Sequence, residues 1–273
     1  MSPIQEKFHL TGKTAIVTGG IGLLGKEFCR TLAEAGASVL VADLNGDAAE
    51  AYAAELRSKG YDAGFARVNV TDPESVQAMV GCSVDLFGSV DILVNSAAMD
   101  PKFDQSQAGQ HGSTFEDFPV DAWRQAVDVN LTGMFLCCQA AAREMVKKNT
   151  GVLINICSTY GLVGPDQRIY IRPGEPRRVK PVYYSVTKAG VLGLVHYLAT
   201  YYAGTKIRVN ALTPGGVFNQ HDDLFAKNYS SRTVLGRMAN LDEMNGALLF
   251  LASEASSYMT GSNLVVDGGW TAW

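Results

Sequence analysis

Short runs of apolar residues alternate with longer helical patterns over nearly the whole chain. Runs such as SVLVA and VLINI are apolar at almost every position, which is typical of strands buried on both faces of a sheet. Seven strands are predicted, at 14–18, 38–43, 64–70, 91–95, 151–157, 207–212 and 263–266. The stretches between them are long enough for crossover helices, so we predict one α/β sheet, mostly parallel and doubly wound, with helices on both faces.

Helical periodicity fills the stretches between these strands, and glycines stand where several helices should end. The predicted helices span 22–35, 46–58, 73–86, 121–148, 182–202 and 242–252, with Asp72 as the N-cap of the third. Two segments, 100–119 and 164–181, follow strands but carry no such pattern. Because open parallel sheets bind ligands at the carboxyl ends of their strands, these segments are expected to border a ligand site.

Composition and charge narrow the class of protein. The chain has 273 residues, 47% of them hydrophobic, and no linker-like change of composition, so a single domain over 1–273 is expected. The net charge of −4 argues against a nucleic-acid partner. No signal peptide and no apolar stretch long enough to span a bilayer is found, so the sequence predicts no membrane partner and a cytoplasmic protein. The cysteines, which lack metal-type spacing, are predicted to be reduced core residues: Cys29, Cys82, Cys137, Cys138 and Cys157.

A glycine-rich loop, TGGIGLLG, joins the first strand to the first helix. Its glycines, Gly19, Gly22 and Gly25, permit tight turning and the close approach of a ligand. The N–H groups and positive dipole end at the start of a helix attract a pyrophosphate, and Leu24 lies in this first turn. The loop therefore predicts a dinucleotide site, the alternative being a plain strand-to-helix connection.

The end of the second strand bears on which dinucleotide binds. Asp43 stands where an acidic side chain accepts hydrogen bonds from the adenosine ribose hydroxyls. A 2′-phosphate would meet like charge there, and the next residues, Leu44 and Asn45, offer no basic side chain. NAD (NADH) is therefore predicted in preference to NADP, with Asp43 and Leu44 beside it. An N-cap role for Asp43 is the alternative and is compatible with this one.

Four polar residues follow in order: Asn130 in VDVNLTG, Ser158 in INICSTYG, and Tyr184 and Lys188 in YSVTK. Lys188 comes four residues after Tyr184, hence on the same face of a predicted helix. An ammonium beside a phenol, whose ordinary pKa is near 10, favours the phenolate, so Tyr184 is predicted to be a general acid or base. The alternatives are a surface pair for Tyr184 and Lys188, a turn cap for Ser158 and a backbone hydrogen bond for Asn130.

These motifs, together with NSAA, RVNALTPGG and TGSNLVVDGG, resemble the short-chain dehydrogenase/reductase family from about residue 11 to the C-terminus. The resemblance implies a single-domain Rossmann-type fold and an NAD(H)-dependent interconversion of a secondary alcohol and a ketone. It implies that Tyr184 is the acid/base and that Ser158 hydrogen-bonds the substrate oxygen. It further implies that Lys188 binds the nicotinamide ribose and that Asn130 holds a water that relays protons.

The same resemblance implies further cofactor contacts, some at positions that depart from the family pattern. They are Asn69 and Val70 beside the adenine, Asn95 and Ala97 after the fourth strand, and Pro214, Gly215, Val217 and Asn219 near the nicotinamide. The family often has Asp at the position of Asn69, Asn at that of Ser96 and Thr at that of Asn219. An amide at Asn69 or Asn219 can still bind the adenine or the carboxamide.

A basic insertion separates Ser158 from Tyr184 by 26 positions, against about a dozen in most members of the resembled family. Its sequence, GPDQRIYIRPGEPRRVKP, carries Arg168, Arg172, Arg177 and Arg178. Because guanidinium groups bind carboxylates and phosphates, an anionic substrate is predicted, with Lys102 of the other irregular segment on the same rim. A solvated loop or a subunit contact is the alternative. The stretch 217–235 is predicted to be a mobile lid.

Several substrate classes remain open. NSAAMDPKFD, the basic insertion and LVVDGGWTAW resemble a subgroup of oxidoreductases of bacterial surface-sugar and flagellin modification, which implies a nucleotide-linked or otherwise anionic sugar. The alternatives are a gluconate-type polyol or sugar-acid dehydrogenase and a ketoacyl reductase. A dinucleotide-sensing binding module without turnover is the alternative outside enzymes. The four histidines form no ligand pattern, so no metal site is predicted.

The helices predicted at 121–148 and 182–202 carry apolar residues on more than one face, so they need cover. In the resembled family the equivalent helices pair between subunits, which implies a homo-oligomer, either a dimer or a tetramer. Three hypotheses compete for Trp270 and Trp273 in the terminal WTAW: they anchor a subunit interface, they close the site of a neighbouring subunit, or they are core residues.

Overall fold

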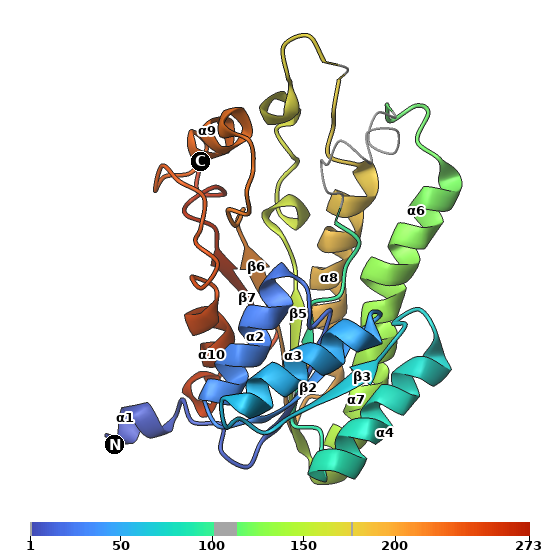
Figure 1. The fold of residues 1–273 in the computed structure, drawn as a ribbon, viewed down its shortest axis with the longest axis vertical. Helices are drawn as coiled ribbons and strands as arrows, with labels where there is room; N and C mark the ends of the chain where they lie inside the picture. The colour runs from blue at the N-terminus through green and yellow to red at the C-terminus, as the bar shows by residue number, and fades with distance from the viewer. Residues whose placement is uncertain (1, 101–113, 176) are drawn as a thin grey trace.

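The computed structural model describes residues 2–100, 114–175 and 177–273, and seven strands of this part form one sheet (Figure 1). The strands are β1 (Thr14–Thr18), β2 (Ser38–Asp43), β3 (Ala63–Arg67), β4 (Ile92–Asn95), β5 (Thr150–Ile156), β6 (Lys206–Pro214) and β7 (Asn263–Val266). Their order is β3-β2-β1-β4-β5-β6-β7, and every neighbouring pair is parallel. The predicted Rossmann-type α/β sheet is confirmed, and it is wholly rather than mostly parallel in the described residues.

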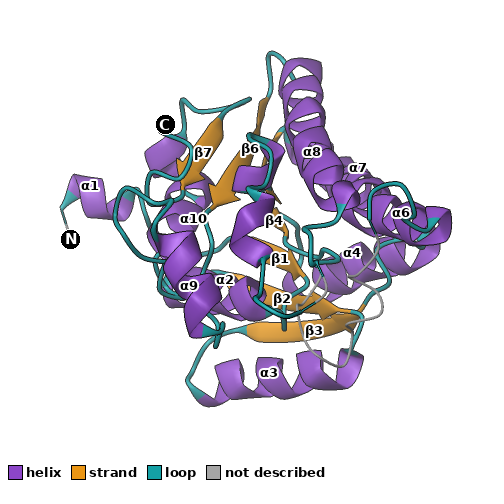
Figure 2. Ribbon diagram, turned by 90° about the horizontal axis from the view of Figure 1, so that it is seen from above, coloured by secondary structure: helices purple, strands orange, loops and turns teal. Residues whose placement is uncertain are grey.

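Helices cover both faces of this sheet, as Figure 2 shows from above. The helices of the described residues are α1 (Pro3–Glu6), α2 (Leu23–Glu34), α3 (Gly46–Ser58), α4 (Pro73–Phe87), α6 (Val120–Val127), α7 (Gly133–Lys148), α8 (Val182–Tyr201), α9 (Asp223–Ser230) and α10 (Asn245–Ala252), of which α1 projects away from the sheet. The core on one face joins α2, α3 and α10, and the core on the other joins α4, α7 and α8. Successive strand residues enter opposite cores: Val39 and Val41 belong to the first, and Leu40 belongs to the second.

The predicted helix boundaries are close to those observed. The Asp72 side chain caps α4 by accepting a hydrogen bond from the Glu74 N–H at 3.0 Å, and Gly88 ends that helix with a φ of 80°. Asn45 caps α3 in the same way, through the Ala48 N–H at 3.1 Å. These caps satisfy backbone groups that a helix leaves unpaired at its ends.

Three predicted elements differ from the structure. The helix expected at 121–148 is interrupted by a π-helical turn over Asp128–Thr132, between α6 and α7. Strand β3 ends before Asn69, whose side-chain oxygen accepts hydrogen bonds from Thr71 and turns the chain. Helix α10 begins three residues later than expected, at Asn245.

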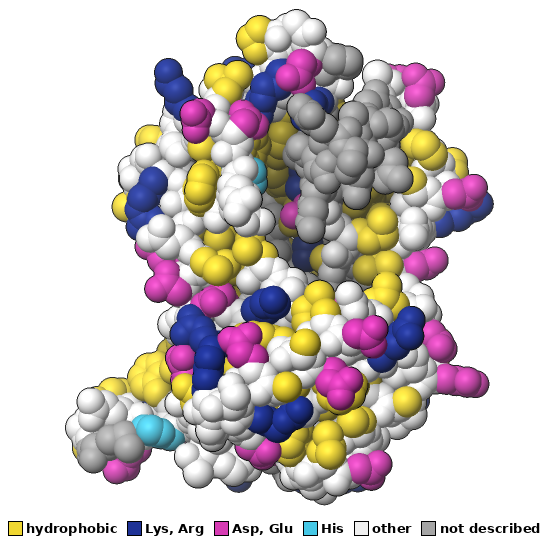
Figure 3. All heavy atoms as spheres, viewed as in Figure 1, with side chains coloured by type: hydrophobic (Ala, Val, Ile, Leu, Met, Phe, Trp, Pro, Cys, Tyr) yellow, Lys and Arg dark blue, Asp and Glu magenta, His cyan; other side chains and the backbone are white. Residues whose placement is uncertain are grey.

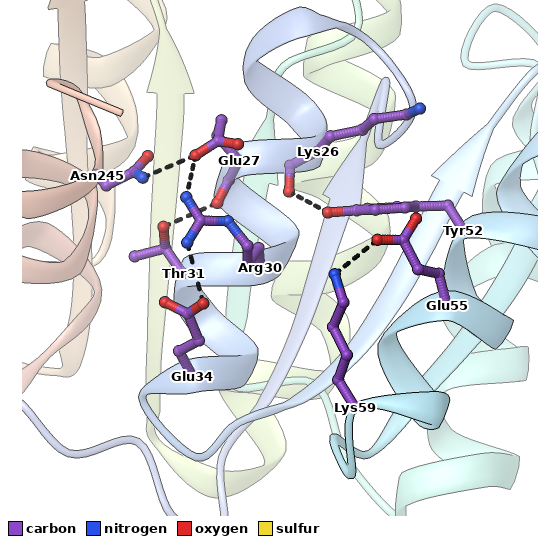
Figure 4. Close-up of polar contacts among 9 residues, drawn as sticks. All are labelled: Lys26, Glu27, Arg30, Thr31, Glu34, Tyr52, Glu55, Lys59 and Asn245. Atoms are coloured by element: carbon purple, nitrogen blue, oxygen red, sulfur yellow. Dashed lines mark hydrogen bonds and ion pairs between the residues drawn. The ribbon is translucent and has the colours of Figure 1, made fainter. Parts of the chain in front are cut away.

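Polar contacts hold α2, the helix that follows the glycine loop, between α3 and α10 (Figure 4). Glu27 pairs with Arg30 on α2 and accepts a hydrogen bond from the Asn245 amide of α10 at 3.0 Å. On the other side, the Tyr52 hydroxyl of α3 donates to the Lys26 carbonyl at 2.7 Å. The start of α2 is thereby fixed relative to the sheet.

All five cysteines are free thiols, and four of them are buried, as predicted. No helix in the described ranges is long and apolar enough to cross a bilayer.

Candidate active site

The segments that follow β5 and β6 rise above the carboxyl edge of the sheet (Figure 1). This edge includes the point where the strand order reverses, between β1 and β4. Open α/β sheets bind ligands at such a point. In Figure 3 the surface is hollowed above the same edge.

Tyr184 and Ser158 meet at this edge. Tyr184 lies in the first turn of α8, and Ser158 lies two residues after the end of β5. The two hydroxyls are hydrogen-bonded to each other, and the Ser158 oxygen also accepts from the Tyr160 N–H at 3.3 Å. Ser158 therefore serves both as the turn cap and as a partner of Tyr184.

Lys188 reaches the same place from one turn further along α8 and is buried. Its Nζ donates to the Ile156 carbonyl at 2.8 Å and lies 5.9 Å from the centre of the Tyr184 ring. Burial lowers the pKa of Lys188. The predicted surface-pair alternative does not apply, because a buried lysine held by a strand carbonyl is no surface residue.

Asn130 lies in the π-helical turn and is buried. Its Oδ1 accepts from the Met99 N–H at 2.6 Å, and its Nδ2 donates to the Met99 carbonyl and to the Thr187 hydroxyl, both at 3.2 Å. The side chain therefore ties the segment after β4 to α8. Single π-turns inside helices are frequent at functional sites.

Burial dominates the electrostatics of Tyr184. It raises the pKa of Tyr184 well above its ordinary value, and the Asp100 carboxylate raises it further, while the Ser158 hydrogen bond lowers it. The Lys188 Nζ lies 5.9 Å from the centre of the ring, and its favouring of the phenolate stays a prediction. At neutral pH the Tyr184 hydroxyl carries its proton.

Another lysine lies nearer to Tyr184 than Lys188 does. The Lys180 Nζ stands 4.0 Å from the centre of the Tyr184 ring and 2.5 Å from an oxygen of Asp100. The sequence placed Lys180 in the basic insertion but gave no reason to single it out, because the fold of the insertion alone brings it over the ring.

The glycine loop approaches the end of β4 closely. Gly19 has a φ of 65°, and a Cβ there would lie 2.8 Å from the Ala97 Cα. A Cβ at Gly25 would lie 2.0 Å from the Gly19 carbonyl oxygen. Gly22, the N-cap of α2, supplies no side-chain cap, and Leu24 is half-buried in the first turn. This bare helix start fits a pyrophosphate, whose oxygens would meet backbone N–H groups.

Asp43 is fixed against this loop. Its carboxylate accepts from the Ile21 N–H at 3.3 Å and from the Asn45 N–H at 3.1 Å, and Leu44 is exposed. Arg67 stands opposite Asp43 in the register of β2 and β3, with its side chain packed on Gly46. Sequence reasoning missed this basic side chain beside the expected ribose site, because it looked only at residues adjacent in the chain.

The predicted contacts on the adenine side are arranged as follows. Asn69 uses its side-chain oxygen within its own turn, and Val70 packs on Gly133. The Ala97 N–H donates to the Thr18 hydroxyl at 3.4 Å. The Asn95 amide is buried in the core, where it donates to Asn155 at 2.8 Å and to the Cys138 sulfur at 3.2 Å. The Asn95 side chain is thus engaged between β5 and α7, and its predicted contact with the cofactor stays a prediction.

The predicted nicotinamide contacts follow β6. Pro214 ends the strand, and the Gly215 N–H donates to the Val266 carbonyl at 2.9 Å. Val217 forms an isolated bridge with Ala239, and the Asn219 N–H donates to the His221 Nδ1 at 3.2 Å. The segment 217–235, whose role as a lid stays a prediction, therefore starts from a backbone that is tied to β7.

The arginines of the insertion are largely engaged with nearby carboxylates. Arg168 pairs with Asp166 at 2.8 Å, Arg172 with Asp222 at 2.7 Å, and Arg178 with Glu175 at 2.7 Å. Arg177 is exposed. Lys102, the fifth predicted substrate residue, lies outside the described residues.

A largely aromatic cluster of buried residues, which the sequence did not predict, packs against Tyr184. It consists of Tyr160, Ile169, Tyr170, Phe225, Tyr229, Met238 and Trp270, with Tyr184 packed against it. Trp270 is buried and stacks on Tyr229 with ring centres 4.3 Å apart, so the core hypothesis for Trp270 is confirmed. Trp273 is exposed and donates to the Arg232 carbonyl. The aromatic residues within TYG, RIY and DLFAKNY are the sequence signal that could have indicated this cluster.

In the ranges 2–100, 114–175 and 177–273, no three His, Cys, Asp or Glu side chains gather as a metal site would require.

Comparison with known proteins places this geometry among oxidoreductases. A family model described as enoyl-(acyl carrier protein) reductase matches residues 19–271. The cis-4-hydroxycyclohexanecarboxylate dehydrogenase of Sinomonas cyclohexanicum is 35% identical over 266 residues, 95% of this chain and 97% of that protein. The D-threitol dehydrogenase of Mycolicibacterium smegmatis is 33% identical over 98% of this chain and 96% of its own length.

Solved structures agree with these relatives. The crystal structure of a gluconate 5-dehydrogenase from Burkholderia cenocepacia in complex with NADP and tartrate is 31% identical. It superposes with a TM-score of 0.86 and covers 98% of this chain and 99% of that chain.

Proposed function

Because the chain belongs to the short-chain dehydrogenase/reductase family and is an oxidoreductase acting on secondary alcohols, we propose that Tyr184 is its proton donor and acceptor. The observation that carries this proposal is the meeting of Tyr184, Ser158 and Lys188 beside a bare helix start at the same sheet edge. Asn130 braces this arrangement from the π-helical turn.

The proposed chemistry follows from the protonated state of Tyr184. A nicotinamide dinucleotide, when bound, supplies or accepts the hydride at the substrate carbon. In the reducing direction Tyr184 gives its proton to the carbonyl oxygen, which the Ser158 hydroxyl holds by a hydrogen bond. In the oxidising direction Tyr184 must first lose its proton and then takes the proton of the alcohol. Lys188 supports that step with a fixed positive charge.

NAD(H) is the proposed cofactor. Asp43 presents a carboxylate where a 2′-phosphate would lie, and it is held there by two backbone N–H groups. The gluconate 5-dehydrogenase structure contains NADP, and Arg67 stands opposite Asp43 here. The preference between NAD and NADP is therefore to be measured. Asp43→Ser should improve kcat/KM for NADP and lower it for NAD. If wild-type kcat/KM is higher with NADP, the proposal of NAD(H) is wrong.

The proposed substrate is a small polyol, sugar acid or alicyclic alcohol. Relatives named above act on 4-hydroxycyclohexanecarboxylate, threitol and gluconate. The buried, largely aromatic cluster packed against Tyr184 makes the surroundings of the proposed proton donor apolar, which suits a carbon ring. The nucleotide-linked sugar of the surface-sugar subgroup is less favoured, because the arginines expected to bind its phosphates are paired with Asp166, Asp222 and Glu175.

A substrate panel tests this proposal. NADH absorbance is followed with the purified protein and alicyclic hydroxy acids, tetritols, sugar acids, nucleotide-linked amino sugars and acyl ketones. Turnover in the first three groups supports the proposal, and turnover confined to nucleotide sugars would support the surface-sugar hypothesis instead.

A variant tests the proposed role of Tyr184. Tyr184→Phe, which keeps the ring but lacks the hydroxyl, should abolish turnover and retain NADH binding. NADH binding without any turnover by the wild type would instead indicate a dinucleotide-sensing module.

A homo-oligomer is also proposed. Apolar side chains of α7 and α8, including Phe135, Val186, Tyr197 and Tyr201, are exposed to solvent in the single chain. Pairing of these helices between two copies would cover them.

A further inference from the structure

Tyr184 faces two ammonium groups, and the closer one lies outside the Y-x-x-x-K motif. The Lys180 Nζ is 4.0 Å from the centre of the Tyr184 ring, whereas the Lys188 Nζ is 5.9 Å from it. Lys180 comes from the end of the insertion and Lys188 from one turn further along α8. The two charges therefore reach the phenol from separate elements.

Lys180 is held in place by contacts that do not depend on its side chain. Its backbone N–H donates to the Gln167 Oε1 at 2.8 Å, and its carbonyl accepts from the Gln167 Nε2 at 3.2 Å. Only 9% of its side chain is exposed. A lysine confined in this way cannot move freely into solvent, so its charge acts on a fixed neighbour.

Asp100 balances this charge. One of its carboxylate oxygens lies 2.5 Å from the Lys180 Nζ, and its side chain is 58% exposed. Asp100 thus opposes the ammonium from the solvent side, while the Tyr184 ring lies against it on the protein side. A change at either residue alters the net charge that Tyr184 experiences.

The other ionisable groups around Tyr184 come from every element packed on it. Lys188 lies on α8, and Cys157 and Tyr160 come from the segment after β5. His221, in the segment 217–235, is near enough to Asp100 and Lys180 for their charges to act on it. Among these groups, Lys180 is the one that stands over the ring and has a carboxylate as its own counter-ion.

A cation on the face of a phenol ring stabilises the phenolate more than the neutral phenol, because the phenolate ring is richer in electrons. We propose that Lys180 is a positioning residue which sets the proton affinity of Tyr184, and that Asp100 is the counter-ion which limits its effect. This proposal rests on the proposed role of Tyr184 as acid/base.

The test is the pH dependence of kcat for alcohol oxidation, which requires the phenolate. Lys180→Met should move the rising limb to higher pH by about one unit, and so reduce kcat at a fixed pH on that limb by about tenfold. Asp100→Asn should move it by a similar amount to lower pH. The double variant should fall near the wild type, and Lys180→Arg should keep the wild-type profile.

The controls separate charge from structure. Lys147→Met removes one positive charge from an exposed ion pair on α7 and should leave the profile unchanged. Lys180→Gln is a second neutral variant, and Gln167 still holds the backbone in both. If both neutral variants keep the wild-type profile and differ only in KM or melting temperature, Lys180 is a structural residue and the proposal is overturned.

A second readout does not need turnover. The phenolate of Tyr184 is measured by ultraviolet difference absorbance at one alkaline pH, each variant being compared with the same variant carrying Tyr184→Phe. Less phenolate in Lys180→Met than in the wild type supports the proposal, and equal phenolate contradicts it. A wild type that has no dehydrogenase activity refutes the proposed function, but this absorbance still decides whether Lys180 controls Tyr184.

Discussion

At the scale of single residues, burial of Tyr184 favours its protonated state, and the two directions of the reaction depend on that state in different ways. A phenol enclosed by Ser158, Lys180 and the aromatic cluster loses hydration that its charged form needs. The same enclosure keeps Tyr184 protonated, so its proton is in place for ketone reduction, whereas alcohol oxidation first requires that proton to leave. The two directions of turnover should therefore respond differently to pH.

The expected difference has a definite sign. Because the pKa of Tyr184 is raised, the acid form dominates at every pH below that value, and kcat for ketone reduction should stay flat across the neutral range. The phenolate fraction rises about tenfold for each pH unit in this range, so kcat for alcohol oxidation should climb with a slope near one on a logarithmic scale. Initial rates in both directions, measured under saturating cofactor, check this. An oxidation rate that is flat from neutral to alkaline pH would show that Tyr184 is already ionised.

Some features of the site could be predicted from the sequence, and others depend on the fold. Asn130, Ser158, Tyr184 and Lys188 could be predicted because each stands in a recognisable local motif. The position of Lys180 over the Tyr184 ring could not, because it depends on how the insertion folds back through Gln167. The direction of the Tyr184 pKa likewise depends on burial, which a local motif does not contain.

At the scale of elements, the strand-to-helix connection of α2 is the most constrained part of the nucleotide site. Gly25→Ala would put a methyl group 2.0 Å from the Gly19 carbonyl oxygen, which belongs to backbone that cannot easily move. We expect a loss of about 2 kcal/mol in the free energy of unfolding and at least a tenfold weaker binding of NADH. Chemical denaturation and NADH fluorescence titration measure the two effects. Gly81→Ala on α4, where a Cβ would meet nothing within 4 Å, is the matched control.

Two ion pairs join the segment 217–235 to the insertion, Arg172–Asp222 at 2.7 Å and Arg232–Asp166 at 3.7 Å, and the shorter one suggests a second test. Arg172 reaches Asp222, the N-cap of α9, at 2.7 Å and also donates to two backbone carbonyls in its own segment. Arg172→Ala should loosen α9 and raise KM for the substrate several-fold, with NADH affinity unchanged. Steady-state kinetics and NADH titration measure these quantities. If Arg177→Ala, which removes an exposed arginine of the same insertion, raises KM more, the predicted direct contact of that arginine with substrate is favoured instead.

Regular elements were predictable because their patterns are local. Strands β1, β2 and β7 begin and end where the apolar runs do, and glycines or capping side chains mark the ends of α3 and α4. The π-helical turn at Asp128–Thr132 escaped prediction, since its sequence keeps a helical pattern while one extra residue is accommodated in the turn. The late start of α10 is of the same kind: the Asn240 N–H bonds to Glu243, and the preceding residues form a turn.

At the scale of the whole molecule, two cores and a parallel sheet bury the apolar faces of most helices but leave part of α8 uncovered. Tyr197 and Tyr201 are 63% and 66% exposed, and their rings stack on each other 5.9 Å apart. Val186, near the start of the same helix, is also exposed. Side chains of this kind on one helix are typical of a surface that another subunit covers.

The oligomer can be tested through this helix. The wild type should have at least twice the mass of the 29.3 kDa chain by light scattering. Tyr201→Glu combined with Val186→Glu would place two charges in the proposed interface, where each would lose hydration without gaining a partner, so the variant should shift toward the monomer. Ile4→Glu, which changes an exposed apolar residue of α1, should keep the wild-type mass. A wild type that is monomeric at micromolar concentration would mean that the exposed tyrosines of α8 meet solvent.

Subunit contact should also support the active site, because α8 carries Tyr184 and Lys188. If the contact holds this helix in place, the dissociated variant should have both a lower melting temperature and a lower turnover than the wild type.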